Sequence, residues 1–557
     1  MKKLYFLALS VLASASLMAA QVKVAASSDL QAAGSDLQAA VNGASSGDTV
    51  LVQAGTYEGN FTMKDGVYVS GGWNEDFTAQ TEHASILDAK ANGRVLNQPD
   101  KFETLTIWDN FTIQNGSSNT ENTDKLGNGV VVMKKGRVIN CLIQNNTFTH
   151  TANNQGGGLA HETGDATDTC AINCIIRNNN ATHGGGVRIR GIILNSIVEN
   201  NNATKNGGGM YLQWTGEAHN CIIRYNVCAE NVGGVDINGP SAITNSLIYG
   251  NKAKKQIGGL YMRKAANVIN CTVVCNDQEE EGNNAIFAGL RSGSGTATDY
   301  NGKYFINNIV WGNTLKGQLQ AEQVHTYLKH YGTNGTCKNN ALQGANSIGV
   351  EYLALATDNA AANGPQFVDS TCTIAWTSPL YNAGSNDAVA KILGDKDVYG
   401  NARKQGENID LGAVEHTVHT LTVAAVENGT LALKVLEQTM PLEAKAYEVP
   451  AGFTATILAT PAEKYALEAI LLNGSVLAAV EDVYTLPAVQ SDVTLGATFV
   501  TESDPDNPTN VENVLSMSQV VAVYDMLGRQ ISTTPDQLTT GLYIVLTTKG
   551  THKISIK

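Results

Sequence analysis

Apolar and polar positions alternate in short segments that recur along the middle of the chain. Each segment follows a run of glycines and carries mostly apolar residues at its first and third positions. The segments are 159–162, 187–190, 210–213, 235–238 and 260–263. Because successive residues of a β-strand point to opposite faces, this pattern predicts short strands with one buried face.

A second marker recurs in step with these strands. An Asn-Cys or Asn-Ser pair followed by apolar residues begins at Asn140, Asn173, Asn195, Asn220, Asn245 and Asn270, and the last three intervals are 25 residues each. A repeat of this length with three short strands is typical of one coil of a parallel β-helix. Stacked coils place equivalent residues about 4.8 Å apart. We therefore expect the Asn side chains to form ladders that satisfy the backbone of the turns.

The cysteines follow the same repeat. The chain has 9 Cys, an odd number, so they cannot all pair with one another. One repeat position holds Cys141, Cys174, Cys221 and Cys271, and also Ser196 and Ser246. Since it accepts small, slightly polar residues, we expect buried free thiols there. Candidate bridges for an oxidising compartment are Cys170–Cys174 and Cys228–Cys275.

The two ends of this region fit the same scaffold. Asp36 is a candidate N-cap for a short helix over 37–44, which would plug the first coil. The segments around 47–57 and 67–73 resemble the opening coils of pectate-lyase-like right-handed β-helices. The resemblance implies the fold and no single activity, because that family includes lyases, hydrolases, esterases and adhesins.

Residues 378–384 and 410–415 resemble the last coils of secreted bacterial members of the same family, so the resemblance spans about 30–416. It implies that the run holding Asp397, Arg403, Asp410 and Glu415 closes the last coil through a structural Arg–carboxylate pair.

The remainder of the chain has a different character. Alternating strand patterns over 417–500 predict a small β-domain, similar to spacer modules of bacterial surface proteins. Residues 501–510 read as a linker by composition. Residues 511–557 hold short strands separated by turn signals, and they resemble the C-terminal sorting domain of type IX secretion cargo. This resemblance implies a Gram-negative cell, export across the outer membrane, and the type IX secretion machinery as a partner.

The N-terminus and the composition agree with export. Residues 1–20 combine Lys2 and Lys3 with an apolar run that ends in small residues, as a secretory signal peptide does. No later segment has 18 consecutive apolar residues, so we expect no transmembrane segment in the mature chain. A net charge of −14 excludes a general nucleic-acid binder, and 43% hydrophobic residues exclude a disordered chain.

Candidate chemistry lies in the second and fourth positions of the repeated strands, which we expect to point outward as a flat patch. These positions hold the candidate ligand-binding residues Arg188, Arg190, Tyr211, Gln213, Asp236, Asn238, Tyr261 and Arg263, with Trp214 and Lys264 at the margin. Sugar rings stack on aromatic rings, amides bond hydroxyls, and guanidinium groups pair with uronate carboxylates. The competing interpretation is an ordinary solvated face.

Catalysis has less support in these residues. Glu162 and Asp236 are three coils apart, roughly 14 Å at about 4.8 Å per coil, which is too far for a hydrolytic carboxylate pair at about 5–9.5 Å. A lyase could use Tyr211, Asp236, Tyr261 and Arg263 as its catalytic groups. No acidic cluster accompanies them, so we expect no metal or other cofactor, with Ca²⁺ relevant only if the protein is a lyase.

We therefore expect an all-β chain: a right-handed parallel β-helix over 21–416, followed by two small β-sandwich-like domains. The expected function is that of an exported cell-surface or secreted protein that binds a polysaccharide or a host or cell-surface glycan without catalysis, as an adhesin does. The alternative is a polysaccharide lyase acting on an acidic, uronate-containing glycan. A third possibility is a purely structural surface spacer.

Overall fold

The structure is a computed structural model, and it describes most of the chain. The described residues are 19–118, 126–148, 154–162, 168–280, 290–292, 297–319, 328–343, 351–435, 438–501, 520–525, 528–532, 539, 541–548 and 550–556. Residues 1–18 of the expected signal peptide and 502–510 of the expected linker lie outside them. The chain divides into two compact units, Met1–Thr417 and Val418–Lys557, which are described separately.

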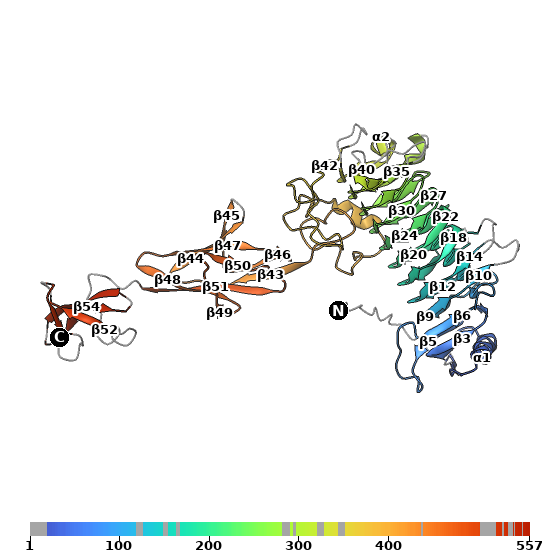
Figure 1. The fold of residues 1–557 in the computed structure, drawn as a ribbon, viewed down its shortest axis with the longest axis horizontal. Helices are drawn as coiled ribbons and strands as arrows, with labels where there is room; N and C mark the ends of the chain where they lie inside the picture. The colour runs from blue at the N-terminus through green and yellow to red at the C-terminus, as the bar shows by residue number, and fades with distance from the viewer. Residues whose placement is uncertain are drawn as a thin grey trace. The chain divides into compact units, whose positions relative to one another are not determined.

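The first unit is a right-handed parallel β-helix, as expected (Figure 1). Two twelve-stranded sheets, one nine-stranded sheet and one seven-stranded sheet run along the stack of coils. The sheets extend from β1 (Gln21–Val24) to β40 (Thr336–Lys338), from β3 (Gly55–Glu58) to β42 (Leu353–Leu355), from β4 (Phe61–Thr62) to β35 (Leu290–Ser292), and from β18 (Asn180–His183) to β39 (Gln318–Leu319). The seven-stranded sheet was not anticipated, because we expected three strands per coil.

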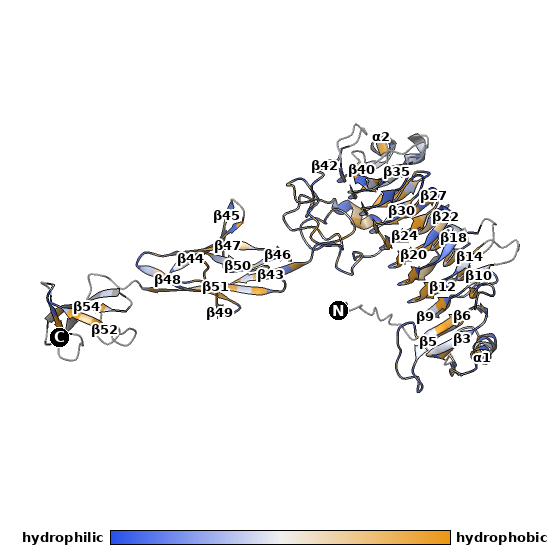
Figure 2. Ribbon diagram, in the orientation of Figure 1, coloured by the Kyte–Doolittle hydropathy of each residue, from blue (hydrophilic) through white to orange (hydrophobic). Residues whose placement is uncertain are grey.

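A single coil illustrates the arrangement. It contains β23 (Met210–Gln213), β24 (Glu217–His219), β25 (Ile222–Arg224) and β26 (Val227–Cys228). Met210 pairs in register with Val235 of the next coil, 25 residues later, so apolar residues stack on apolar residues. Their side chains fill a continuous core inside the coils. Figure 2 shows hydrophobic and hydrophilic stretches interleaved through this stack.

Asparagine ladders stabilise two turns of the coils between Asn140 and Asn313, which confirms the expectation from the repeat. The outer ladder contains Asn140, Asn173, Asn195, Asn220, Asn245, Asn270 and Asn307, all with φ between 49° and 59°. The inner ladder contains Asn146, Asn179, Asn201, Asn226, Asn251, Asn276 and Asn313, all buried. In the inner ladder, Asn226 Nδ2 donates to Asn251 Oδ1 at 2.9 Å and to Val198 O at 2.9 Å. Each side chain thus satisfies backbone and amide groups of neighbouring coils.

The cysteine column is buried, as expected, and all nine cysteines are free thiols. Neither candidate bridge is formed. Cys221 Sγ donates to His219 O at 3.2 Å, and Ser246 Oγ in the next coil donates to Thr244 O at 2.8 Å. Cysteine and serine therefore alternate in this column because each bonds the carbonyl two residues earlier.

The helix at the N-terminal end differs from the expectation. α1 (Leu30–Gly43) begins seven residues before the predicted start, and Asp29 caps it by accepting from Ala32 N at 3.0 Å. The prediction from Asp36 was wrong because the apolar face begins earlier, at Ala33, and continues through Leu37. This face packs into the core of the coils, so the helix covers the first coil as expected.

Two short helices cover the other end of the coil core. Tyr300, in η1 (Ala297–Tyr300), packs edge-on against Tyr331, in α2 (Lys329–Asn334), with ring centroids 4.8 Å apart. Both rings are fully buried, and the Tyr331 hydroxyl donates to Ala266 O. These two short helices therefore close the core where 378–416 was expected to do so.

Residues 356–416 instead lie against the outer faces of the two twelve-stranded sheets. Leu380 and Leu411 pack with Ile222 and Ile309 on one sheet, and Ile409 packs with Ile269 and Ile306 on the other. The expectation that this segment forms the last coil was therefore wrong. Its apolar residues find partners because the outward positions of these strands are also apolar.

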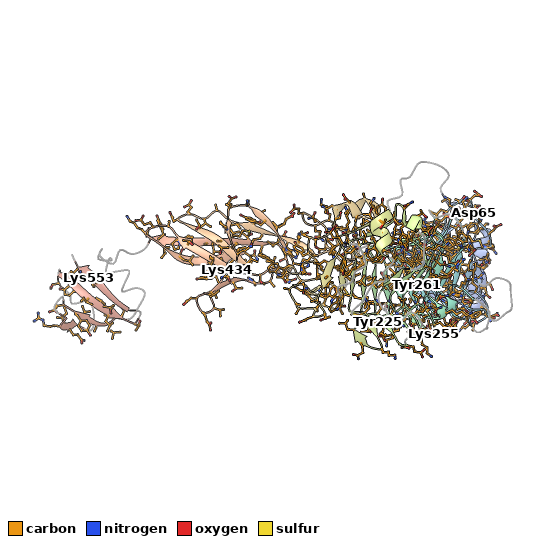
Figure 3. The ribbon with its side chains drawn as sticks, turned by 90° about the horizontal axis from the view of Figure 1, so that it is seen from above. Asp65, Tyr225, Lys255, Tyr261, Lys434 and Lys553 are labelled. Atoms are coloured by element: carbon orange, nitrogen blue, oxygen red, sulfur yellow. The ribbon has the colours of Figure 1, made fainter. Side chains whose placement is uncertain are left out.

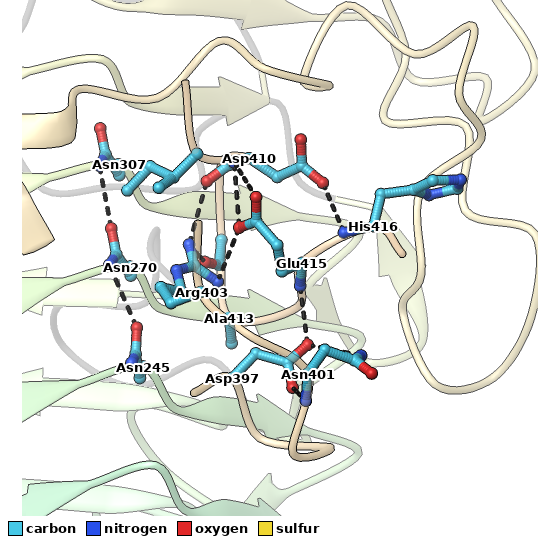
Figure 4. Close-up of polar contacts among 12 residues, drawn as sticks. Asn245, Asn270, Asn307, Asp397, Asn401, Arg403, Asp410, Ala413, Glu415 and His416 are labelled. Carbon is cyan, nitrogen blue, oxygen red and sulfur yellow. Dashed lines mark hydrogen bonds and ion pairs between the residues drawn. The ribbon is translucent and has the colours of Figure 1, made fainter. Parts of the chain in front are cut away.

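The expected Arg–carboxylate pair is present within this segment (Figure 4). Arg403 and Glu415 are both buried, with Nη1 3.6 Å from Oε2. Arg403 also donates to the carbonyls of Asp410 and Gly412, and Asp397 accepts from the backbone N–H of Glu415 at 2.9 Å. Figure 4 also shows the outer Asn ladder beside this cluster.

The second unit contains three sheets. Two are antiparallel, and the five-stranded sheet also contains one parallel pair of strands. Between 418 and 501, a five-stranded sheet runs in the order β46 (Ala446–Pro450), β43 (Val418–Val423), β51 (Val493–Thr501), β48 (Tyr465–Leu472) and β49 (Ser475–Val476). A four-stranded sheet holds β45 (Gln438–Leu442), β44 (Gly429–Val435), β47 (Ala455–Pro461) and β50 (Tyr484–Leu486). The last sheet holds β53 (Gln530–Ser532), β52 (Val520–Tyr524), β54 (Gly541–Thr547) and β55 (Gly550–Ile556). The predicted fold class is thereby confirmed.

Within the described residues, no helix has both the length and the apolar character needed to cross a bilayer.

Candidate functional site

The candidate residues lie on or directly after strands of the nine-stranded sheet: β15 (Leu159–His161), β19 (Val187–Ile189), β23, β27 (Val235–Asn238) and β31 (Leu260–Met262). Arg190 and Arg263 directly follow β19 and β31. Their first and third positions point into the coil core, as predicted. The second positions stack in register, so Arg188 pairs with Tyr211, Tyr211 with Asp236, and Asp236 with Tyr261. The structure therefore brings these four residues together in consecutive coils.

The expectation of a flat exposed patch was wrong for three of these four residues. Arg188 is 2% exposed, Tyr211 is 7% exposed and Asp236 is fully buried. Tyr261 is half-buried and is labelled in Figure 3. The side chains point away from the coil core, but neighbouring side chains cover them. Alternation along a strand predicts which face a residue points to and does not predict what lies over that face.

Arg188 is held by a network at one end of the column. Its guanidinium contacts Glu162, donates to Gln213 Oε1 at 3.0 Å and donates to His161 O at 3.0 Å. Glu162 also pairs with Arg190 at 2.8 Å. Burial lowers the pKa of Arg188, and the charge of Glu162 opposes this change. Two guanidinium groups therefore contact the same carboxylate.

Asp236 is held by a bidentate ion pair. Arg263 Nε and Nη2 each lie 2.7 Å from one carboxylate oxygen, and Nη2 also donates to Asn206 Oδ1 at 2.8 Å. Burial raises the pKa of the Asp236 carboxyl, and Arg263 opposes the rise. Burial alone would lower the pKa of Arg263, but the hydrogen bonds and charge of Asp236 outweigh it and raise the pKa. Both oxygens of Asp236 are thus engaged by the protein itself.

Tyr211 is covered by a residue of the neighbouring seven-stranded sheet. His183, at the end of β18, stacks on its ring with centroids 5.5 Å apart. Burial lowers the pKa of His183 to about 4, so the imidazole is neutral at pH 7. Asn238 Nδ2 donates to the Tyr211 hydroxyl at 2.9 Å. The seven-stranded sheet therefore supplies the side chain that covers Tyr211, which the sequence pattern did not reveal.

The accessible groups lie at the margin of this network. Trp214 is 64% exposed, and the guanidinium of Arg190 lies 5.9 Å from its ring. Its backbone is left-handed, with φ of 52°, which is an outlier for a bulky residue and is found most often at functional or strained positions. Gln213, Asn238 and Arg263 are partly accessible beside it. The candidate residues that a ligand can contact therefore lie at the edge of this network, which we call the rim.

The two carboxylates considered for hydrolysis stay far apart in the structure. Glu162, which follows β15, and Asp236 on β27 are three coils apart, as expected. In the described ranges, no group of three or more His, Cys, Asp or Glu side chains is placed to hold a metal ion.

Comparisons with known proteins agree with the fold. The family described as right handed beta helix region matches residues 103–278. A similar solved structure is the A-module of the Azotobacter vinelandii mannuronan C-5 epimerase AlgE4, at 13% identity over 56% of this chain and 90% of that chain, with a TM-score of 0.29. No curated protein matches the chain. The family match thus covers the middle coils of the right-handed parallel β-helix, and at this identity and TM-score we infer nothing from the epimerase.

Proposed function

We propose that the protein is an exported cell-surface or secreted β-helix protein that binds glycans without catalysis, as an adhesin does. The observation that carries the proposal is Trp214, a large aromatic ring that is mostly exposed in a left-handed turn beside Arg190. An exposed aromatic ring offers a large apolar contact area to a sugar ring. Partly accessible Gln213 and Asn238 lie next to it and can bond hydroxyl groups.

The charges at this rim favour an acidic glycan. Arg188 and Arg190 share Glu162, and Lys264 is exposed at the end of β31. A uronate carboxylate at this rim would lie near the Arg190 guanidinium, which is 5.9 Å from the Trp214 ring. These cations stand out in a chain whose net charge is −14.

The ion pair of Asp236 supports binding over catalysis. A general base or a Ca²⁺ ligand needs a free carboxylate oxygen, and Arg263 bonds both oxygens of Asp236. The lyase alternative would require this pair to open when the substrate binds.

Export and the type IX machinery form part of the proposal. The four strands within 520–556 support a compact C-terminal module of the kind that sorting requires. Removal of 511–557 should leave the chain in the periplasm of a type IX-competent cell, as measured by cell fractionation. Release of the truncated chain into the medium would contradict this assignment.

The binding proposal can be tested with the chain lacking residues 1–20 and a panel of acidic and neutral polysaccharides. We expect binding to an acidic glycan that weakens with salt. Trp214→Ala should weaken it about tenfold, equivalent to about 1.4 kcal/mol. Trp214→Phe keeps an aromatic ring and should retain most of the affinity. Met440→Ala, at an exposed position of the second unit, serves as a neutral control.

The same experiment separates the alternatives. Absorbance of an unsaturated uronate product that disappears in Tyr261→Phe would establish a lyase. An absence of binding across the panel, or equal binding by Trp214→Ala and the unmodified chain, would contradict the proposal and favour a structural spacer.

A further inference from the structure

Residues with a left-handed backbone form a column in another turn of the coils, the one that follows β25 and the equivalent strands. It contains Asn145, Asn178, Asn200, Tyr225, Gly250, Cys275 and Gly312, with φ between 54° and 67°. Asn and Gly adopt this conformation readily. Tyr225 is the bulky exception: its φ is 55°, and it follows Asn200 and precedes Gly250 in the column. A bulky side chain here costs roughly 1–2 kcal/mol relative to a right-handed conformation.

The neighbouring coil makes room for the Tyr225 ring. A Cβ added to Gly250 would lie 2.7 Å from two ring carbons of Tyr225, so the ring rests directly over this glycine. The ring also meets Tyr249 edge-on, with centroids 5.3 Å apart. Nevertheless Tyr225 is 49% exposed. Gly250 and Tyr249 pack against the ring and leave much of it exposed to solvent. Figure 3 labels Tyr225 and Tyr261 at separate places.

The guanidinium beside this ring is paired with a carboxylate. The guanidinium of Arg224 lies 5.8 Å from the Tyr225 ring centroid. Arg224 Nε donates to Glu199 Oε2 at 2.7 Å, and Nη1 donates to the Tyr249 hydroxyl at 2.8 Å. Glu199 thus engages Arg224, and Arg177 stacks in register with Glu199 on its other side. The pKa of Arg224 is raised, because these hydrogen bonds and charges outweigh the effect of burial.

We propose that Tyr225 and Arg224 form a second carbohydrate-binding site that takes an uncharged glycan. The apolar face of a pyranose ring stacks on the exposed Tyr225 ring, and the remaining N–H groups of Arg224 donate to sugar hydroxyls. Because Glu199 already pairs with Arg224, we expect this guanidinium to bond hydroxyl groups of an uncharged sugar. It occupies the turn after β25, whereas Trp214 occupies the turn after β23 in the same coil. The two sites can therefore be lost independently.

Asn offers a matched substitution for the test. Asn200 holds the same turn in the preceding coil with φ of 54°. Tyr225→Asn therefore removes the ring and keeps a residue suited to the backbone. We expect its thermal midpoint to stay within about 2 °C of the unmodified chain, because the relieved backbone strain offsets the lost contact with Tyr249.

The experiment measures calorimetric binding of neutral cello-, manno- and malto-oligosaccharides to the full chain lacking residues 1–20. We expect binding of at least one series, with no change between low and high salt, and a loss of at least about tenfold in Tyr225→Asn. Tyr225→Phe and Trp214→Ala should both retain this binding. Retained affinity in Tyr225→Asn would overturn the proposal, as would an absence of binding to every neutral series.

A structural role for Tyr225 predicts a different outcome. If the ring served only to pack against Tyr249, Tyr225→Asn would lower the thermal midpoint by more than about 5 °C, and the unmodified chain would bind no neutral sugar. That pair of results would overturn the second site and leave the Trp214 proposal unaffected.

Discussion

Removal of the Arg263 side chain should be the most damaging single change on the nine-stranded sheet. Asp236 is fully buried, and both of its carboxylate oxygens accept from Arg263 at 2.7 Å. Loss of one partner of a buried pair costs about 3–5 kcal/mol, because it leaves an unpaired charge without water. The Arg263 side chain is 30% exposed, so we expect a cost near the lower bound, about 3 kcal/mol, for Arg263→Met.

The reverse change should be milder. In Asp236→Asn the guanidinium can turn to solvent and keep its bond to Asn206, so we expect a loss of about 1–2 kcal/mol. The double variant Asp236→Asn with Arg263→Met removes both charges. It should be more stable than Arg263→Met alone, because the two effects are coupled.

The pH dependence supplies an independent check. In Arg263→Met, burial raises the pKa of Asp236 above its ordinary value of 3.8, with no Arg263 cation to oppose the rise. The folded state then binds the proton more tightly than the unfolded state, so stability falls as the pH rises above about 4. The stability that Arg263→Met loses relative to the unmodified chain should therefore be small near pH 4 and largest near pH 7.

Urea unfolding followed by circular dichroism measures these differences, with constant m-values required for the comparison. The reasoning would be refuted if Arg263→Met and Asp236→Asn cost equal amounts below about 1 kcal/mol. It would also be refuted if the deficit of Arg263→Met did not change between pH 4 and pH 7.

Three further predictions concern the scaffold. Asn226→Ala should lower the free energy of unfolding in urea by about 3 kcal/mol or more, because it removes a fully buried amide bonded to two neighbouring coils. Asn220 is only partly buried and has a left-handed backbone, so Asn220→Gly should cost about 1 kcal/mol or less. Equal losses in the two variants would contradict this account of the ladders. Cys221→Ser should shift the thermal midpoint by only a few degrees, about 2–4 °C, since serine holds the same column in adjacent coils; a large drop would show that the sulfur is needed. Burial raises the pKa of Glu415 to about 9 even though the charge of Arg403, 3.6 Å away, opposes the rise, so the contact between them involves a protonated carboxyl at neutral pH. Between about pH 5 and 9 the folded chain retains this proton and the unfolded chain loses it, so stability should fall with rising pH by up to about 1.4 kcal/mol per unit. Glu415→Gln should remove that slope, and parallel curves for the two chains would refute the assignment.

Much of the scaffold could be predicted from the repeat. Each coil contacts mainly its neighbours, so the 25-residue interval between Asn195, Asn220 and Asn245 already implies stacked coils and Asn ladders. The inward positions of the strands were predictable for the same reason, because alternation along a strand is a local property. The start of α1 was misplaced since both Asp29 and Asp36 are acceptable N-caps, and only packing of Ala33 against the coils selects between them.

The candidate site was predictable only in part. The residues that stack in one column, from Arg188 to Asp236, were identified correctly as neighbours. Their burial was not, because His183 and Asn206 reach them from another sheet of the same coils. No pattern within a strand records a contact between sheets. The exposed rings of Trp214 and Tyr225 became evident only when exposure and backbone conformation were known.

The amino-acid sequence by itself therefore determined the β-helix, its coil length and the residues that face its core, since all of these follow from a short-range repeat. Tertiary structure decided which outward residues meet water. It also placed 356–416 along the flank of the coils, and left α2 to cover their end. The physical reason is the same in each case: burial depends on which distant segment lies over a surface, and that is settled by the packing of the whole fold.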